Sequence, residues 1–303
     1  MEVIKVTPRG YCKGVVRAIQ IAKQARAAYP NEEIYILGML VHNQYVIKAL
    51  DLLNIKSVEN SKLNRMELLN EVPNECVLIF SAHGISDQVI HAAKAKGCKC
   101  IDASCPDVLK TQEIVKKYVN DDYHVLYIGK KNHPEAEAVL AISDKIHLIT
   151  SENDIEKLNI SSNVFVTNQT TMSINDVSKL FDTIKLKFPQ ALICDEICNA
   201  TRIRQQAISN LIDQNIDVLY VVGDKKSINS NRLAQIAKEI HIPKVLLIDD
   251  VNDIDLNDLI NCHKVAITSG ASTPTYLTNQ VIDYLENIEI NQIKPNIDIS
   301  KML

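Results

Sequence analysis

Three cysteines stand at equal intervals along the 303-residue chain, and they are its best candidates for metal ligands. Cys105 lies 93 residues after Cys12, and Cys198 lies 93 residues after Cys105. Each follows a short apolar segment and precedes a helical pattern, where backbone N–H groups and the helix dipole favour a thiolate over a thiol. Three thiolates around one cavity suit either a metal ion or an iron–sulfur cluster.

The ligand number favours a cluster over structural zinc. Structural zinc takes four ligands, usually from paired C-x-x-C motifs, and the sequence has no such pair. A four-iron cluster held by three cysteines keeps one iron open, and that iron can act as a Lewis acid. The remaining five cysteines are expected to be small buried hydrophobic residues; they are Cys76, Cys98, Cys100, Cys194 and Cys262.

Polar residues recur at matching places after the apolar strands of the repeat. About 30 residues after each cysteine, a strand ends in a polar loop, and these loops carry His42, His133, and Ser227 with Asn229. A later strand in each repeat ends in small polar residues, which include His83, Thr170 and Ser272. Three copies of one α/β unit would explain the three cysteines and all six loops, because ligands bind beyond the carboxyl ends of the strands in such units.

The histidine, serine and asparagine positions form a mostly neutral set that is rich in hydrogen-bond donors. Such groups can surround an anion, so we expect a small phosphorylated or diphosphorylated substrate. No Walker loop or dinucleotide motif accompanies them. Glu135 is either a carboxylate that complements a helix dipole or a general acid over the cavity, and Glu137 is its rival.

Short apolar runs alternate with amphipathic stretches, which predicts an α/β fold with mainly parallel sheets. The expected strands are Ile34–Leu37, Val77–Phe80, His124–Ile128, Ile146–Ile149, Asn163–Val166, Val218–Val222, Val245–Ile248 and Lys264–Thr268. The expected helices are Val15–Ala28, Gln88–Lys96, Val108–Asn120, Ile174–Phe188 and Ile203–Gln214. We predict three pseudo-threefold-related lobes around a central cluster; they are 1–98, 99–190 and 191–303, the last with a C-terminal tail.

Composition narrows the class of protein. The net charge of −4 gives little electrostatic support for nucleic-acid binding. No apolar run approaches the length of a membrane span, and Met1 opens directly into a strand-like segment, so we expect no membrane association and a cytoplasmic location. In a reducing compartment, eight cysteines are more consistent with metal ligands than with a disulfide framework.

The motifs around these positions resemble those of the 4-hydroxy-3-methylbut-2-enyl diphosphate reductase family, IspH/LytB. The matching blocks are PRGYCKGVVRAI at 8–19, VHNQYV at 41–46, FSAHGIS at 80–86, DASCP at 102–106, HPEAEA at 133–138, QTTMS at 169–173, DEICNATRIRQ at 195–205, GDKKSINSNRL at 223–233 and TSGASTP at 268–274. They run through nearly the whole chain in one order. The resemblance implies reductive removal of an allylic hydroxyl, giving isopentenyl and dimethylallyl diphosphate in the last step of the non-mevalonate pathway.

The resemblance also implies a role for each residue. Cys12, Cys105 and Cys198 would hold one [4Fe–4S] cluster per chain, with an open apical iron. The diphosphate would be bound by His42, His83, Ser227, Asn229 and Ser272. His133 would serve diphosphate binding and the proton network, and Glu135 with Thr170 would deliver a proton to the departing hydroxyl. A low-potential donor such as ferredoxin or flavodoxin would supply the electrons.

One position departs from the family pattern. The family usually has two adjacent serines before the asparagine of the substrate loop, whereas this chain has Ser227-Ile228-Asn229. One hydroxyl donor to the diphosphate is therefore missing.

Two other functions are compatible with a three-cysteine cluster. A redox-neutral hydro-lyase could use the open iron for dehydration without an external reductant. A non-catalytic cluster sensor would need no general acid and would usually carry a partner- or DNA-binding module, which the sequence does not indicate.

Overall fold

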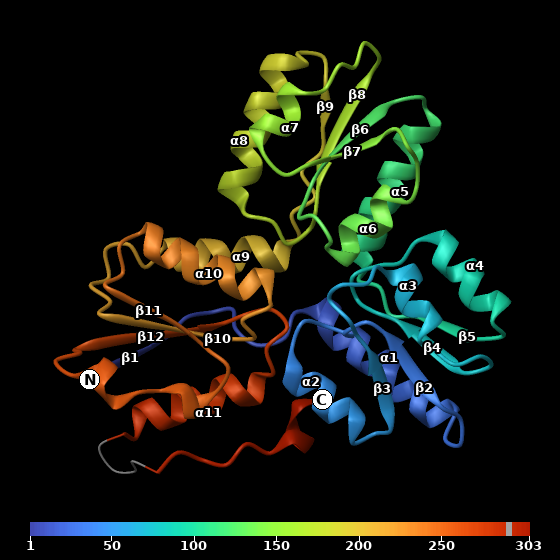
Figure 1. Cartoon of the computed structure of the whole chain (residues 1–303). Helices are drawn as coiled ribbons and strands as arrows, with labels where there is room; N and C mark the ends of the chain where they lie inside the picture. Colours follow the sequence, from blue (N-terminus) through green and yellow to red (C-terminus); the bar gives the residue numbers. More distant parts are fainter. Residues whose placement is uncertain (289–292) are drawn as a thin grey trace. The chain divides into compact units, whose positions relative to one another are not determined.

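The structure is a computed structural model that describes residues 1–288 and 293–303. The chain divides into two compact units. Unit 1 comprises Met1–Val16, Val41–Leu52 and Asn199–Leu303, and unit 2 comprises Arg17–Leu40 and Leu53–Cys198. Figure 1 shows the helices and strands of both units.

The described residues form three parallel sheets of four strands, and all three have the same strand order. The first, in unit 2, has the order β3 (Ile55–Val58), β2 (Ile34–Leu37), β4 (Val77–Phe80), β5 (Lys99–Asp102). The second, also in unit 2, has the order β7 (Ile146–Ile149), β6 (His124–Ile128), β8 (Val164–Asn168), β9 (Leu192–Ile193). The third, in unit 1, has the order β11 (Lys244–Ile248), β10 (Val218–Val222), β12 (Lys264–Ser269), β1 (Glu2–Lys5). The α/β class, the parallel sheets and the internal repeat are therefore confirmed.

The edge strand of each sheet is the segment that leads into a cysteine. Strand β5 precedes Cys105, β9 precedes Cys198 and β1 precedes Cys12. Because these strands pair with β4, β8 and β12, the sheets divide the chain differently from the predicted boundaries at 98/99 and 190/191. Residues 99–102 complete the first sheet, and the N-terminal strand completes the third. The physical reason is that an edge strand belongs to the sheet with which it forms hydrogen bonds, even where the cysteine after it leads into the first helix of the next repeat.

Helices connect the strands and cover the sheets. They are α1 (Lys13–Ala28), α2 (Gln44–Asp51), α3 (Arg65–Asn70), α4 (Asp87–Ala95), α5 (Pro106–Asn120), α6 (Pro134–Leu140), α7 (Glu152–Glu156), α8 (Ile174–Lys187), α9 (Asn199–Ser209), α10 (Ile228–Glu239) and α11 (Thr275–Glu286), with short 3₁₀ helices η1 (Val251–Asp253), η2 (Leu256–Leu259) and η3 (Ile299–Met302). The five predicted helices are present. The last of them begins four residues earlier than predicted, directly after Cys198.

Alternation along the central strands builds a core on both faces of a sheet. In β10, Tyr220 packs with the core that includes α11, whereas its neighbours Leu219 and Val221 pack with the core that includes α9 and α10. In β6, Leu126 and Tyr127 likewise enter opposite cores. Successive side chains of a strand point to opposite faces, so a strand that is buried on both faces must be apolar throughout. The sequences of these strands are therefore almost continuously apolar.

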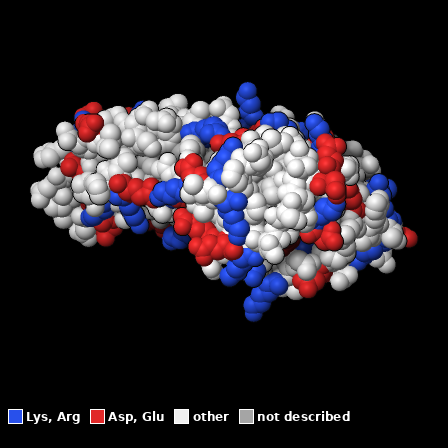
Figure 2. Space-filling view, turned by 90° about the horizontal axis from the view of Figure 1, so that it is seen from above, with Lys and Arg blue, Asp and Glu red and all other residues white. Residues whose placement is uncertain are grey.

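The surface charge is mixed on the face that Figure 2 shows. Lys and Arg side chains are interspersed with Asp and Glu over the face in Figure 2, with broad uncharged areas between them. Among residues 1–288 and 293–303, no helix is both long and apolar enough to cross a bilayer.

Candidate active site

Each of the three cysteines is held by the same backbone hydrogen bond. The N–H of Cys12 donates to the carbonyl of Ala271 at 3.0 Å in unit 1. In unit 2, the N–H of Cys105 donates to Ala82 at 2.9 Å, and that of Cys198 donates to Thr170 at 3.0 Å. The three acceptors lie just after β12, β4 and β8, which are equivalent strands in the three sheets. The repeat therefore places the three cysteines in equivalent positions, at the carboxyl end of a sheet.

A helix begins directly after each of these cysteines. The three helices are α1, α5 and α9. Cys105 is the N-cap of α5 in an extended conformation, and its side chain makes no capping hydrogen bond to the helix. All three cysteines are half-buried, and none forms a disulfide. The positive end of each helix dipole thus lies next to the sulfur that a cluster would require as thiolate.

The other five cysteines pack in or against apolar cores, as expected of structural residues. Cys76 and Cys98 belong to the core of the first sheet, with their sulfur atoms 3.7 Å apart. Burial raises the pKa of Cys76 to about 12, which keeps it a thiol. Cys100, Cys194 and Cys262 are partly buried against other core residues.

Glu135 is a buried acid at the start of α6. Its side chain is 2% exposed. Thr170 donates to it twice, from its N–H to Oε1 at 2.8 Å and from its hydroxyl to Oε2 at 3.1 Å, and the Tyr127 hydroxyl lies 3.4 Å from Oε1. Burial raises the pKa of the carboxyl from 4.5 to about 7, although the hydrogen bonds from Thr170 and Tyr127 oppose the shift. Glu135 is therefore protonated in a large fraction of molecules near neutral pH and can donate a proton.

Thr170 connects this acid to a cysteine. Its N–H and hydroxyl bind Glu135, while its carbonyl accepts the N–H of Cys198. The same residue therefore fixes the proton donor and one of the predicted cluster ligands in unit 2.

The rival carboxylate, Glu137, has a different environment. It is half-buried, and burial raises its pKa, although the nearby Arg65 guanidinium opposes the shift. A cation beside a carboxylate stabilises the ionised form, so Glu137 is the poorer proton donor of the two.

His133 and His83 lie together in unit 2. Their rings meet edge to face, with centroids 5.6 Å apart. His133 is the N-cap of α6, and its Nδ1 accepts the N–H of Glu135 at 3.2 Å. The neutral ring therefore carries its proton on Nε2. His83 Nδ1 lies 3.3 Å from the Ser81 hydroxyl.

Unit 1 brings His42 together with Ser272. The Ser272 hydroxyl donates to the His42 carbonyl at 3.0 Å. Asp224 fixes the neighbouring segments, because one of its carboxylate oxygens accepts the N–H of Gln44 at 3.1 Å and the other accepts that of Lys226 at 2.7 Å. This carboxylate joins the loop after His42 to the loop before Ser227.

The loop after β10 ends at the N-terminus of α10. Ser227 is the N-cap, and its hydroxyl accepts the N–H of Ser230 at 3.3 Å. Ile228 is the first residue of the helix and is half-buried. Asn229 is 7% exposed, and neither polar atom of its amide has a hydrogen-bond partner among residues 1–288 and 293–303. A buried amide without partners is costly, so its place near a helix N-terminus is consistent with ligand binding.

The structure shifts two of the equivalences inferred from spacing. His133 is the N-cap of α6, and the N-cap of the equivalent helix α2 is Asn43. His42 therefore lies one residue before the position that is equivalent to His133. Ala82 and Thr170 are equivalent through their bonds to Cys105 and Cys198, so His83 corresponds to Thr171. One-residue offsets of this kind are invisible to spacing, because loops in different repeats differ in length.

Two supporting residues were absent from the sequence prediction. Tyr127 belongs to the apolar run of β6 and carries no polar pattern, so nothing marked its hydroxyl as a partner of Glu135. Asp224 occurs in the GDKKSIN segment, where its position directly after the strand and glycine could have indicated a loop-fixing carboxylate.

Comparisons with known proteins agree with this geometry. A protein of Anoxybacillus flavithermus named 4-hydroxy-3-methylbut-2-enyl diphosphate reductase is 46% identical over 295 residues, covering 96% of this chain and 92% of that protein. A Bacillus pumilus protein of the same name is 46% identical over 312 residues, covering 100% and 98%. A solved structure of the E-1-hydroxy-2-methyl-but-2-enyl-4-diphosphate reductase of Plasmodium falciparum is similar, with a TM-score of 0.88, 32% identity and coverage of 99% and 96%.

The fold and the site define an α/β enzyme of three repeats, with a cysteine at the same junction in each repeat and one buried acid. The match to the LytB protein family extends over residues 3–286, and this chain belongs to that family.

Proposed function

We propose that this protein reduces (E)-4-hydroxy-3-methylbut-2-enyl diphosphate to isopentenyl and dimethylallyl diphosphate. Its relatives are named as this reductase, and a solved structure 28% identical, with a TM-score of 0.68, is described as the terminal enzyme of the non-mevalonate pathway. The reaction takes two electrons and two protons. One proton leaves with the allylic hydroxyl as water, and the other ends on carbon.

The observation that carries this proposal is the chain of contacts from Glu135 through Thr170 to Cys198. It places a buried carboxyl with a pKa of about 7 beside the backbone that holds a predicted cluster ligand. A hydroxide is a poor leaving group, whereas water leaves readily, so a proton donor close to the reducing centre is what dehydroxylation requires. A cluster sensor would have no need of this acid.

Members of the family are iron–sulfur enzymes. We propose one [4Fe–4S] cluster per chain, bound by Cys12, Cys105 and Cys198 with an open apical iron. The chemistry of the donors fits, because each cysteine lies at a helix N-terminus and is held by an equivalent backbone bond. When bound, the cluster supplies electrons and a Lewis-acidic iron.

The diphosphate would be held by neutral and polar donors. The proposed substrate-binding residues are His42, His83, His133, Thr170, Ser227, Asn229 and Ser272. Asn229 has the strongest individual support, because its buried amide can donate to a phosphate oxygen without displacing any internal partner. The N–H groups at the start of α10 add partial positive charge beside it. The missing hydroxyl at Ile228 leaves its backbone N–H as a donor, since α10 begins there.

Three residues would manage the proton. Glu135 donates it to the departing hydroxyl. Thr170 orients both carboxyl oxygens of Glu135, and His133 fixes the first turn of α6 through its bond to the Glu135 N–H. Burial of Glu135 excludes water, which strengthens these contacts and keeps the proton on the carboxyl at neutral pH.

The surroundings of the reaction follow from its chemistry. The electrons would come from a low-potential donor such as ferredoxin or flavodoxin. We propose a cytoplasmic location, since eight cysteines without a disulfide suit a reducing compartment. The mixed charge in Figure 2 and the net charge of −4 support a small-molecule substrate without nucleic-acid binding.

Anaerobic turnover tests the proposal. The protein is purified without oxygen, its iron and sulfide are measured, and the hydroxylated diphosphate is supplied with and without a low-potential reductant. We expect both five-carbon diphosphates to form, and to form only with reductant. A dehydrated, more unsaturated product formed in the absence of reductant would identify a redox-neutral lyase, and a loaded cluster that never turns over substrate would support a sensor.

A further inference from the structure

A basic side chain follows each of the three cysteines by about one and a half helical turns. Each of these side chains contacts the segment just before the next cysteine in the cycle. The three basic residues are Arg17 on α1, Lys110 on α5 and Arg204 on α9. None of them belongs to the site described above, and their three contacts follow the same order as the repeat.

Arg17 holds the peptide that leads into Cys105. Its Nη1 donates to the carbonyl of Ser104 at 2.8 Å within unit 2. Ser104 is fully buried, and its N–H is bound by Asp102 at 2.8 Å. Both the N–H and the carbonyl of the residue before Cys105 are therefore hydrogen-bonded. The bond to the carbonyl comes from the helix that begins after Cys12.

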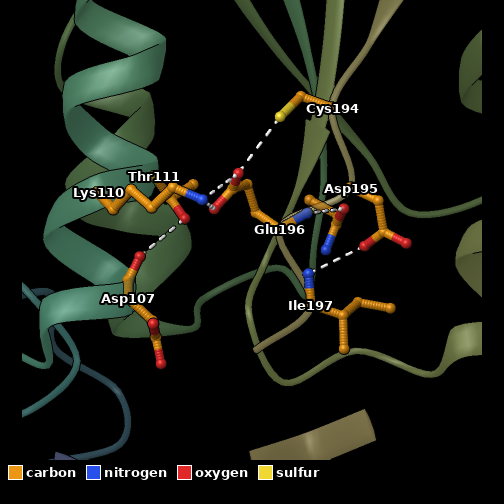
Figure 3. A network of polar contacts seen from close by, with 8 residues as sticks. Asp107, Lys110, Thr111, Cys194, Asp195, Glu196 and Ile197 are labelled. Atoms are coloured by element: carbon orange, nitrogen blue, oxygen red, sulfur yellow. Dashed lines mark hydrogen bonds and ion pairs between the residues drawn. The ribbon is translucent and has the colours of Figure 1, made fainter. Parts of the chain in front are cut away.

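Lys110 holds the segment that leads into Cys198. Its Nζ donates to the two carboxylate oxygens of Glu196 at 2.9 and 3.0 Å. Figure 3 shows Lys110 on its helix pointing toward Glu196. Glu196 is 8% exposed, and its N–H donates to Asn168 at 3.1 Å. A nearly buried carboxylate requires a cation, and the helix that begins after Cys105 supplies it.

Arg204 holds the segment that leads into Cys12. Its Nη2 donates to the carbonyl of Gly10 at 2.8 Å in a buried position of unit 1. The N–H of Gly10 donates to the Ser269 hydroxyl at 2.6 Å. Gly10 has a φ of +73°, and a Cβ there would come within 2.4 Å of the Thr275 hydroxyl, so this turn requires glycine.

We propose that Arg17, Lys110 and Arg204 are positioning residues for the cluster, each tying the helix after one cysteine to the segment before the next. The proposal rests on the proposed function, because it assumes that these cysteines share one cluster. Each contact lies within a single unit. The helices α1, α5 and α9 then connect each contact to the cysteine that directly precedes the helix.

The chemistry of the contacts explains why the three residues are basic. Hydrogen bonds from a charged donor are shorter and stronger than neutral ones, so they fix a backbone carbonyl firmly. A cluster bound by three thiolates is anionic in sum, and positive charge and hydrogen bonds around it shift its reduction potential. Residues that orient metal ligands typically change metal affinity or activity about 10- to 100-fold when replaced.

The test compares the variants Arg17→Gln, Lys110→Gln and Arg204→Gln with the wild-type protein, all loaded with iron and sulfide without oxygen. We expect iron to be lost to a chelator about 10 to 100 times faster in each variant. The electron paramagnetic resonance spectrum and the midpoint potential of the reduced cluster should change as well. Lys110→Arg keeps a cation beside Glu196, so it should restore the rate of iron loss to nearly the wild-type value.

Two control variants separate cluster positioning from general stability. Arg26→Gln lies on the same helix as Arg17 and removes bonds to backbone carbonyls that include those of Tyr29 and Glu32. Lys116→Gln lies on the same helix as Lys110 and removes an exposed ion pair with Asp87. Arg26→Gln should lower the melting temperature of the iron-free protein, and neither variant should alter the spectrum or the rate of iron loss.

Wild-type iron loss, spectrum and potential in Arg17→Gln and Arg204→Gln would overturn the proposal, as would equal changes in the two controls. Failure of the proposed function looks different, because the wild-type protein itself would then hold no cluster or turn over no substrate.

Discussion

Replacing Glu135 by Gln tests the assignment of the general acid most directly. Gln preserves the size of the side chain and can still accept a hydrogen bond from Thr170, but it has no proton to transfer. Thr170 remains bonded to Cys198 through its carbonyl, so the cluster should load normally. The change therefore isolates proton transfer from cluster assembly and from substrate binding.

The expected loss of turnover follows from the role of the acid. General acid catalysis contributes about 10²- to 10⁴-fold, so kcat should fall by that factor, with little change in the Kd of the substrate. In the wild-type protein the carboxyl has a pKa of about 7, so the rate should decline above this pH as Glu135 ionises. This limb of the pH profile should disappear in Glu135→Gln.

Stability gives a second measurement with a definite sign. The fold raises the pKa of Glu135 from 4.5 to about 7, so the neutral form is the one that the folded state prefers. The stabilising contribution is fully present below pH 4.5 and is lost as the pH rises through about 7. The shift corresponds to about 3 kcal/mol. Urea unfolding of the iron-free proteins should therefore show that the free energy of unfolding of Glu135→Gln rises relative to that of the wild type by up to that amount between pH 4 and pH 8.

Glu137→Gln is the matched control for the acid. It makes the same chemical change two residues away, on a carboxyl that lies near Arg65. The assay is anaerobic turnover with measured iron content for each variant. Near-normal kcat in Glu135→Gln would refute the assignment, and a large loss in Glu137→Gln alone would transfer the role to that residue.

Three further predictions concern the cluster and the diphosphate. Cys105→Ser should lose most of the iron and the activity, whereas Cys98→Ser, in the core of the first sheet, should keep the cluster; a full iron complement in Cys105→Ser would show that the ligand is another residue. Asn229→Ala should weaken substrate binding clearly, as measured by KM and by titration with the substrate, because its amide is buried without an internal partner, and unchanged affinity would mean that this loop does not clamp the diphosphate. Ile228→Ser should gain less than about tenfold in affinity, since one hydrogen bond to a charged acceptor is worth at most about 1.5–3 kcal/mol and the backbone N–H or water can replace much of it; a far larger gain would contradict this.

Central strands were predictable because their local pattern matches their environment. Strands β2, β4, β6 and β10 are buried on both faces, and their apolar runs gave the observed bounds. Strand β3 was missed because it lies at the edge of its sheet and two of its four residues, in the order Ile-Lys-Ser-Val, are polar. The helix α6 was expected only through Glu135 in a helical first turn, because a helix of seven residues is too short to show a clear periodic pattern.

The sequence by itself determined the repeat and the fold class, and it singled out the three cysteines and Glu135 as candidates. These features depend on residue type and spacing, which the chain displays directly. The tertiary structure decided the rest, because it depends on contacts between distant segments. Glu135 becomes an acid with a pKa of about 7 only when folding buries it and brings Thr170 to it, 35 residues away. Arg17 reaches Ser104 across 87 residues, and Arg204 reaches Gly10 across 194. Separations of that size leave no periodic trace in a sequence, since only the folded backbone sets which side chain meets which carbonyl.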